Sequence, residues 1–420
     1  MASSKPHATV VGAGSIGISC AVHLQSEGYD VTVIDRVPPG QGCSFGNAGG
    51  VVPCSVLPEF HAGVLTKLPG WLLDPLGPLH IRWRHLPKAL PWMLKAAHCV
   101  KPSVKRHIIE GKAALSLRVL SDYDDIMGKT GTADMLNRVD GIRLFDSEEQ
   151  YRAEDGSRKI LREFGFDQKR ISPGELRELE PDIATDFALG TWYDVWYSLK
   201  NPATFVAAMA EAMVRNGGAV LQDDVVSAEH DGTRALRLVL REKGEMVVDK
   251  LVIAAGAYSD LLAKQLGTRT MLEAERGYHL TIPDPGVKIN RNLTWAARHG
   301  AMVPLDVGLR LAGTDEFAGV DAPPNWERAN VLWKVFKRVL PNLRPLDDSA
   351  QRWMGRRPGT PDSLPVIGPS PMLENVWYAF GHGHLGMTWG PTTGRLIAEM
   401  MAGKPSNIDL NRYRIDRFYN

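Results

Sequence analysis

Cysteine is scarce in this chain of 420 residues, and its four cysteines follow no pattern. Cys20, Cys43, Cys54 and Cys99 have neither the C-x-x-C spacing of a zinc site nor the density of a disulfide framework. We therefore expect a reducing compartment and no bound metal. A charge excess is also missing, since 49 Lys and Arg face 48 Asp and Glu. With no recognition helix, zinc-knuckle spacing or basic tail, the sequence argues against nucleic-acid binding.

Long hydrophobic runs are absent as well. No uninterrupted apolar run reaches the roughly 18 residues that a membrane-spanning helix needs. The first expected strand starts so early, at Ala8, that no signal peptide precedes it. We expect a cytoplasmic protein, or one that is peripheral on the cytoplasmic face of a membrane. A hydrophobic content of 44% is enough to build a large core in two domains.

Acidic residues are missing from one segment, residues 75–109. Tryptophan and methionine alternate there with basic side chains: Trp83, Trp92 and Met93 with Arg82, Arg84, Lys88, Lys95, Lys101, Lys105 and Arg106. The segment fits contact with an anionic membrane surface or a quinone pool. It equally fits a lid or helix whose Trp and Leu side chains pack inward while the basic residues are solvated, and the sequence leaves both open.

A glycine-rich turn near the N-terminus is the strongest motif. A strand over residues 8–11 runs into the glycines Gly12, Gly14 and Gly17, and the next strand ends on Asp35. These glycines allow a tight turn, close approach to a pyrophosphate and helix packing, while Asp35 is placed to bind a ribose. The helix N-terminus offers N–H groups to an anion. The sequence therefore predicts a dinucleotide-binding βαβ unit; a glycine turn that binds nothing is the alternative.

A second glycine-rich segment follows at residues 38–50, and it is too long for an ordinary turn. Its backbone N–H groups could line a phosphate or a ring, with Ser44 and Asn47 adding side-chain hydrogen bonds. A flexible linker is the alternative.

Elsewhere the pattern alternates between two kinds of structure. Residues 60–195 mix Pro/Trp-rich stretches with helical patterns, which is typical of an insertion into the nucleotide-binding fold. An α/β pattern resumes with a helix at 203–215, strands near 219–221 and 251–257 and a hairpin-like stretch through 247–248. Alternating residues at 277–282, 302–304 and 309–314 predict an antiparallel sheet on the substrate side. A strand at 376–380 and a final helix through Met400 return to the nucleotide domain.

The motifs GAGSIG, SFGNAGG, VIAAGAYS, GRRPGTPDSLPVIG and AFGHGHLGMT together resemble FAD-dependent D-amino-acid dehydrogenases of the glycine oxidase and sarcosine oxidase superfamily. The segments GWLLDPLGPLHIRWRHLP, ERGYH and RLAGTDEFAG are most similar to the branch with glyphosate oxidoreductase and D-hydroxyproline dehydrogenase. The resemblance covers nearly the whole chain. It implies an α/β fold with a Rossmann-like FAD-binding domain (1–60, 196–275 and 353–420) interleaved with an α+β substrate domain on an antiparallel sheet (61–195 and 276–352).

The resemblance also implies which residues bind FAD. The pyrophosphate would contact Gly12, Gly14, Ser15, Ile16 and Gly17, and the adenosine would contact Asp35, Arg36 and Val225. The diphosphate and the flavin ring would contact Ser44, Asn47, Ala48 and Gly49, and the ribityl chain would contact Ala255 and Gly256. The pyrimidine edge of the ring would contact Gly383, His384, Leu385, Gly386, Met387 and Thr388. A second G-x-G-x-x-G for a nicotinamide is missing. No cysteine falls in the C-terminal flavin segment, so we expect dissociable FAD.

For the substrate, the resemblance implies oxidation of an amine carbon next to a carboxylate. Arg357 occupies the family's position for holding that carboxylate, with a surface salt bridge as the alternative. Arg276 resembles a second carboxylate or phosphonate contact, unless it pairs with an acid such as Glu275. Tyr278 and His279 are further catalytic candidates, and His279 could accept the ammonium proton. Other side chains on strands expected to face the pocket are His299, Met302, Thr314 and Glu316, although roughly half could point away.

The implied reaction transfers a hydride from the amine carbon to flavin N5. The product would be an imine that water converts to a 2-oxo acid, or a cyclic imine from a substrate such as hydroxyproline. A quinone, an electron carrier or oxygen would then reoxidise the flavin. An oxidase of N-substituted glycines, including sarcosine-, glycine- or glyphosate-type substrates, is the alternative enzyme. A flavin-binding subunit without turnover is an alternative of another class.

Overall fold

The N-terminal motif belongs to a six-stranded sheet. The computed structural model describes residues 5–59, 77–298 and 300–419. The order of strands in this sheet is β10 (Ala219–Gln222), β2 (Asp30–Asp35), β1 (His7–Val11), β14 (Lys250–Ile253), β21 (Val376–Phe380) and β20 (Val366–Pro369). All neighbours run parallel except β20, which pairs antiparallel with β21.

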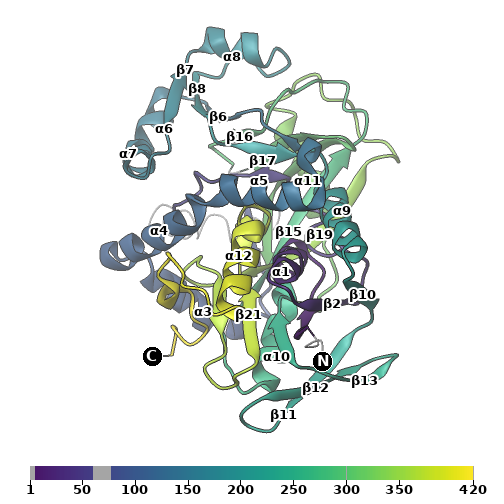
Figure 1. Cartoon of the computed structure of the whole chain (residues 1–420). Helices are drawn as coiled ribbons and strands as arrows, with labels where there is room; N and C mark the ends of the chain where they lie inside the picture. Colours follow the sequence, from purple (N-terminus) through teal and green to yellow (C-terminus); the bar gives the residue numbers. More distant parts are fainter. Residues whose placement is uncertain (1–4, 60–76, 299, 420) are drawn as a thin grey trace.

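Both faces of this sheet are covered. On one face pack the helices α1 (Ser15–Ser26), α9 (Pro202–Arg215), α12 (Gly386–Met401) and α5 (Val119–Thr130), which contact one another (Figure 1). On the other lie α10 (Ser259–Gln265) and the antiparallel strands β11 (Val225–His230), β12 (Ala235–Leu240) and β13 (Gly244–Val247). Parallel strands covered on both faces are apolar throughout, which explains the run Leu251, Val252 and Ile253 in β14.

The helix α9 shows why the predicted elements form where they do. The side chain of Asn201 accepts hydrogen bonds from the N–H groups of Ala203 and Thr204, and Pro202 occupies the first turn. Gly217, with a φ of +91°, follows the C-terminus and turns the chain toward β10. The sequence therefore located this helix closely.

The strand expected over residues 251–257 is shorter than predicted. β14 ends at Ile253, and a 3-10 turn over Gly256–Tyr258 leads into α10. Gly256 adopts a φ of +57°, which is outside the range of an extended strand. The small residues Ala254 and Ala255 suggested a longer strand. They instead follow β14, and their backbone packs closely against Gly12.

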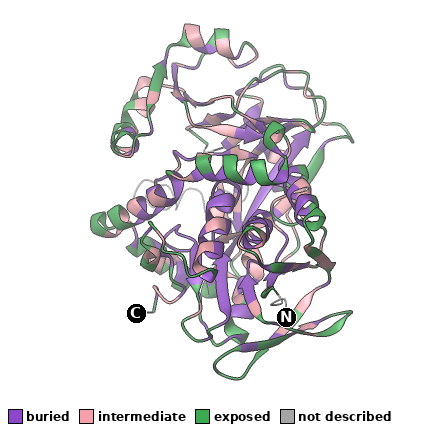
Figure 2. Cartoon of the chain, viewed as in Figure 1, coloured by how far each residue is buried: buried purple, intermediate pink, exposed green. Residues whose placement is uncertain are grey.

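A nine-stranded sheet forms the second body of the molecule. Its strands are β19 (Gln351–Gly359), β15 (Glu273–Ile282), β18 (Gly308–Phe317), β17 (Gly300–Leu305), β16 (Leu293–Trp295), β6 (Gly141–Phe145), β8 (Leu189–Tyr193) and β7 (Gln168–Ile171), with β4 (Leu79–Ile81) beside β18. The sheet was expected to be antiparallel, and it is so except where β16 pairs with β6 and β18 with β4. A separate hydrophobic core lies between this sheet, α8 (Pro173–Leu179) and α11 (Glu327–Phe336). Figure 2 shows the strands at the centre of the molecule largely buried, while α6 (Glu148–Ala153), α7 (Asp155–Glu163) and α8 at the top of the view are more exposed.

Short segments join the two bodies. A small sheet contains β3 (Gly50–Val51), β9 (Tyr197–Leu199) and β5 (Leu136–Asn137). The helices α3 (Leu86–His98) and α4 (Pro102–Ser116) precede α5, and side chains of α4 and α5 share the core of α1 and α12. β15 and β19 run across the expected domain limits at 275 and 352 and belong entirely to the nine-stranded sheet. The precise division into domains stays a prediction.

Candidate active site

One large cavity of about 780 Å³ extends from the glycine-rich turn to the nine-stranded sheet. Most of the predicted site residues line it: Gly12, Gly14, Ser15, Ile16, Asp35, Arg36, Ser44, Asn47, Ala48, Val225, Ala255, Gly256, Tyr278, His279, Arg357 and Gly383 to Thr388. Gly17, Gly49 and Arg276 are the predicted residues that do not line it. The cavity has the size and the mostly apolar wall of a cofactor site.

The glycine-rich turn is packed too tightly for side chains. Gly12 has a φ of +115°, and a Cβ there would lie 2.3 Å from the carbonyl oxygen of Ala254. A Cβ on Gly17 would lie 1.8 Å from the carbonyl oxygen of Gly12, so Gly17 serves helix packing. The first turn of α1, with N–H groups that have no partner inside the helix, therefore borders the cavity. This is the cradle that a pyrophosphate requires.

The adenosine end of the cavity is built around the end of β2. The Asp35 carboxylate accepts hydrogen bonds from the N–H of Ala13 at 2.7 Å and of Val37 at 3.2 Å. Arg36 lies over the ring of Tyr258, with its Cζ 4.2 Å from the centroid, and pairs with Asp224 at 3.3 Å. Tyr258 and Asp224 both line the cavity, and neither was predicted.

The loop at residues 44–50 is held in place, which argues against the flexible linker. The hydroxyl of Ser44 accepts from the N–H of Ser15 at 3.0 Å, and the Asn47 side chain accepts from the N–H of Gly49 at 2.7 Å. Buried Arg310, on β18, donates to the carbonyl oxygens of Phe45 and Asn47. Arg310 carries no local sequence signal for this role, because Phe45 and Asn47 lie more than 260 residues away from it.

The C-terminal segment closes the same end of α1. The hydroxyl of Ser15 donates to the carbonyl oxygen of Gly386 at 3.1 Å. Thr388 accepts from the N–H of Val52 at 3.1 Å and donates to the carbonyl oxygen of Gly50. The start of α12 thus lies beside the start of α1, and two helix N-termini border one cavity.

Arg357 marks the opposite end of the cavity. Its guanidinium covers Gly277, where a Cβ would come within 2.2 Å of Cζ and Nη2. Nη1 donates to the carboxylate of Asp315. Burial alone would lower the pKa of Arg357, but Asp315, Cys43 and Glu275 together outweigh burial and raise it. The side chain remains partly exposed and presents a permanent positive charge to the cavity.

Beside Arg357 lies an aromatic pair. The rings of Trp353 and His279 are stacked at 5.0 Å, and Trp353 crosses Gly46 and Gly355, which leave it room. His279 Nδ1 donates to the carbonyl oxygen of Gly46 at 3.0 Å. Burial, reinforced by Arg310, lowers the pKa of His279 to about 3. The ring is therefore neutral near pH 7, and its low pKa makes His279 a poor acceptor for the ammonium proton, the role that the sequence had left open to it.

Arg276 was expected to contact a carboxylate or phosphonate, and the structure places it elsewhere. Its fully buried guanidinium pairs with Glu316 at 3.2 Å and makes no hydrogen bond within the described part of the chain. Glu316 also accepts from the hydroxyl of Tyr278 at 2.6 Å and from Arg82 at 2.8 Å. Arg276 thus forms the ion pair that the sequence had left as its alternative. The acid is Glu316 and not Glu275.

The remaining pocket candidates also differ from expectation. Met302 is buried, Thr314 donates to the carbonyl oxygen of Arg328, and neither they nor Glu316 line the cavity. His299 lies outside the described residues. Strand alternation could not be resolved by the sequence, because a register shift between Tyr278 and His279 changes which side chains face the cavity.

A cluster of ionisable groups adjoins the cavity next to Arg357. His384 Nε2 lies 3.2 Å from Glu275 Oε2 and 3.7 Å from Glu59 Oε2. Burial raises the pKa of Glu275 to about 7, against the opposing hydrogen bond from His384. One donor atom from each of the three residues lies within 4.8 Å of the others, close enough to share a cation. The absence of a metal stays a prediction, and Glu59 and Glu275 are site residues that the sequence missed.

Comparisons with known proteins agree with this geometry. A family model described as FAD dependent oxidoreductase (DAO) matches residues 7–400. The chain is 34% identical over 429 residues to a D-amino-acid oxidase of Bradyrhizobium diazoefficiens, covering 98% of this chain and 99% of that protein. It is 30% identical to a D-amino acid dehydrogenase of Paramagnetospirillum magneticum, with 97% and 98% covered.

Solved structures share the fold at lower identity. L-proline dehydrogenase from P. horikoshii aligns with a TM-score of 0.75 at 19% identity, over 99% of this chain and 98% of that one. Glycine oxidase from Geobacillus kaustophilus aligns with a TM-score of 0.72 at 20% identity, over 98% and 99%. The predicted Rossmann-like and substrate-sheet architecture and the family resemblance are confirmed. The chain belongs to the DAO family of FAD-dependent oxidoreductases.

Proposed function

We propose that this chain uses FAD to oxidise the amine-bearing carbon of an amino acid, specifically a D-amino acid or a cyclic imino acid, whose carboxylate binds Arg357. The observation that carries the proposal is that one cavity joins the glycine-rich turn to the Arg357 guanidinium. Relatives that cover almost the whole chain are a D-amino-acid oxidase and a D-amino acid dehydrogenase. They support the amino-acid substrate and favour the D configuration.

The residues present fit FAD. Gly12, Gly14 and the first turn of α1 would hold the pyrophosphate, Asp35 the adenosine and the segment 383–388 the edge of the ring. The closed packing at Gly12 supports this assignment, because it brings bare backbone to the cavity wall. Bound FAD supplies the hydride acceptor.

Arg357 would orient the substrate. A guanidinium has five N–H donors, and the hydrogen bond from Nη1 to Asp315 fixes its plane while other donors stay available to a carboxylate. Trp353, stacked on His279, gives the substrate a flat wall next to this charge. Holding the amine carbon in one orientation is the main contribution that these residues make to the rate.

Anaerobic reduction of the flavin tests the proposal. The purified holoenzyme is mixed with D- and L-amino acids, hydroxyproline isomers, sarcosine and glyphosate while the visible flavin absorption is followed. We expect rapid bleaching by a D-amino acid or a cyclic imino acid. Bleaching only by an N-substituted glycine would replace the proposed substrate class, and no bleaching by any member would contradict the proposal. Oxygen uptake against reduction of a soluble quinone then identifies the acceptor.

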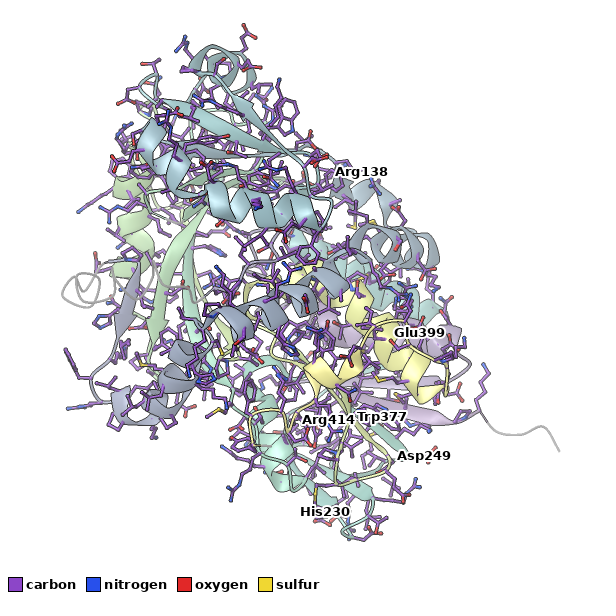
Figure 3. All side chains as sticks on the ribbon, turned by 90° about the vertical axis from the view of Figure 1, so that its left-hand side faces the viewer. Arg138, His230, Asp249, Trp377, Glu399 and Arg414 are labelled. Carbon is purple, nitrogen blue, oxygen red and sulfur yellow. The ribbon has the colours of Figure 1, made fainter. Side chains whose placement is uncertain are left out.

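We further propose that α3 touches an anionic membrane surface, where a quinone acceptor would be found. Trp83 is 75% exposed, and Leu90 and Leu94 are exposed beside the basic residues Arg84 and Lys88. Other parts of the segment follow the inward-packing alternative, since Trp92 is buried and donates to the carbonyl oxygen of Gly359. In Figure 3 the side of the molecule that carries α3 and α4 faces the viewer.

Of the described helices, none combines the length and hydrophobicity needed to cross a membrane. Flotation with vesicles of anionic or neutral lipid tests the surface contact. We expect flotation with anionic vesicles alone, and its loss in the variant Leu94→Ser. The control Val247→Ser removes an exposed apolar side chain from β13 and should float like the parent. Equal recovery with neutral vesicles, or none with either, would reject the contact.

A further inference from the structure

Among the described residues three histidines line the cavity, and burial keeps two of them neutral near pH 7. His279 donates to Gly46, and buried His382 shares a hydrogen bond of 2.9 Å with Thr393. Burial lowers the pKa of both to about 3. His384 differs because its ring is exposed to the cavity and its Nε2 faces carboxylates.

The partner of His384 is a buried acid from the other body of the molecule. His384 lies in the 3-10 turn Gly383–Leu385 before α12, and Glu275 lies on β15. The residue Glu275 is only 3% exposed, and its Oε1 has no hydrogen-bond partner among the described residues. Gly359 leaves space for it, because a Cβ there would lie 2.0 Å from Oε1. Among the described residues, the carboxylate of Glu275 thus has one side-chain partner for a hydrogen bond, His384.

We propose that His384, oriented by Glu275, is the catalytic base that removes a proton from the substrate's ammonium group. The inference rests on the proposed function and names the acid-base chemistry of that same site. Because Nε2 faces Glu275, Nδ1 is the ring atom left to accept the proton. One N–H bond of the ammonium breaks and one forms at Nδ1. The amine lone pair would then assist departure of the Cα hydride, with its two electrons, to bound FAD, and an iminium ion would remain.

A base is needed because a free amino acid carries a protonated amine near pH 7. An ammonium has no lone pair, so it cannot stabilise the carbon from which the hydride departs. Arg357 adjoins the same cluster, so a substrate held there by its carboxylate would have its amine close to His384. His384 would release the proton to solvent after the reaction.

The charges around the pair suit this role. Burial and Arg357 lower the pKa of His384, but Glu59, Glu275 and Asp315 outweigh them and raise it above its ordinary value. Burial raises the pKa of Glu275, assisted by Glu59 and Asp315 and opposed by His384. The raised pKa makes His384 a stronger base than a free imidazole, so its ring takes up a proton more readily.

The variants His384→Gln and Glu275→Gln test the base through the pH dependence of kcat/KM, measured by anaerobic flavin bleaching. For His384→Gln we expect a rate about 100- to 10,000-fold lower at pH 7, recovered as pH rises toward the pKa of the substrate amine. For Glu275→Gln we expect the rising limb to move to lower pH, because the loss of a negative charge lowers the pKa of His384. Opposite shifts in two variants would not arise from a merely structural pair.

A second histidine-glutamate pair provides the control. His85 Nε2 lies 3.0 Å from Glu273 Oε1, and Glu273 is on the same strand as Glu275. Within the described chain, neither His85 nor Glu273 lines the cavity, so His85→Gln should keep the parent pH profile. An unchanged profile in His384→Gln with FAD bound, or an equal loss at every pH in both variants, would overturn the proposal. If the parent is bleached by no amino acid, the proposed function fails and the base fails with it. If His384→Gln does not bind FAD, the proposal is tested by Glu275→Gln alone: a rising limb of kcat/KM at lower pH supports it, and an unmoved limb overturns it.

Discussion

At the residue scale, the missing side chain of Gly277 makes room for the charge that would bind the substrate. Arg357 on β19 reaches across β15 exactly where that strand has no Cβ, and Asp315 on β18 holds its far end. Three neighbouring strands therefore define the position of one guanidinium.

The first prediction concerns the paired N–H donors of the Arg357 guanidinium. In Arg357→Lys the positive charge remains, but the bidentate contact to a carboxylate is lost. We expect the substrate concentration for half-maximal bleaching to rise about 10- to 100-fold, since a hydrogen bond to a charged group contributes about 1.5–3 kcal/mol, while the flavin spectrum is unchanged. Arg352→Lys, at the exposed end of the same strand, is the control. Equal substrate affinity in both variants would remove Arg357 from the substrate site.

The second prediction concerns the space at Gly277. In Gly277→Ala the new methyl group would lie about 2.2 Å from the guanidinium and must displace it. We expect the variant to bind FAD and to lose substrate affinity as severely as Arg357→Lys. Gly128→Ala is the control, because a Cβ at Gly128 in α5 meets nothing within 4 Å. Substrate titration of both variants measures the difference, and full substrate affinity in Gly277→Ala would show that the guanidinium can move without consequence.

At the element scale, the loop at residues 44–50 depends on the second sheet. Arg310 on β18 donates to two of its carbonyl oxygens and to Thr281 Oγ1, and His279 on β15 donates to a third carbonyl. The loop thus contacts the proposed flavin site from one side and the nine-stranded sheet from the other. Its conformation should change if either support is removed.

The third prediction tests this support. Arg310→Lys keeps a positive charge but cannot donate to Phe45, Asn47 and Thr281 in one plane. We expect FAD affinity to fall about 10-fold or more, on the scale of about 1.5–3 kcal/mol for hydrogen bonds to a charged group. Release of FAD is followed by flavin fluorescence after dilution. The control is Arg237→Lys, which alters an exposed residue of β12 that forms ion pairs at the surface. This variant should retain the FAD affinity of the parent. An unchanged affinity in Arg310→Lys would mean that the loop holds its shape without Arg310.

At the scale of the whole molecule, buried ionisable groups set the acid stability. Burial lowers the pKa of His23, His279 and His382 to about 3. Below about pH 6.5 each binds a proton in the unfolded chain but not in the folded one, so stability falls as pH falls. Burial acts in the opposite sense on Glu180 and Glu275, whose pKa is raised to about 7. Between about pH 4.5 and 7 these acids bind protons in the folded chain and partly cancel the histidines.

The fourth prediction follows from these signs. We expect the free energy of unfolding to fall only modestly from pH 7 to pH 5.5 and steeply from pH 4.5 to pH 3.5. In the lower range each of the three histidines costs about 1.4 kcal/mol per pH unit without opposition from the acids. Urea unfolding at fixed pH values measures this. The exposed His230, labelled in Figure 3, supplies the control variant His230→Gln, which should follow the parent curve. A uniform slope from pH 7 to pH 3.5 would contradict the assignment.

Much of the fold was predictable because its signals are local. The turn after β1, the acid at the end of β2 and the capped helix α9 each depend on residues within about one element of one another. The family motifs extended this to the positions of Arg357 and His384. Which acid pairs with Arg276 could not be predicted, because Glu316 lies 40 positions away on β18 and the sequence pattern gives no sign of the register shift at Tyr278.

The sequence by itself determined a nucleotide-binding βαβ opening and, through its motifs, membership of an FAD-dependent family, while the contact of Arg357 with the substrate stays a proposal. The first property follows from glycine geometry and hydrophobic periodicity, and the second from the resemblance of short motifs, so both depend on short stretches of chain. Only the tertiary structure decided which polar groups meet: Arg357 over Gly277, Arg310 on the 44–50 loop and His384 beside Glu275. Residues 80 to more than 260 positions apart form these contacts, and their pairing is fixed by how the two sheets pack.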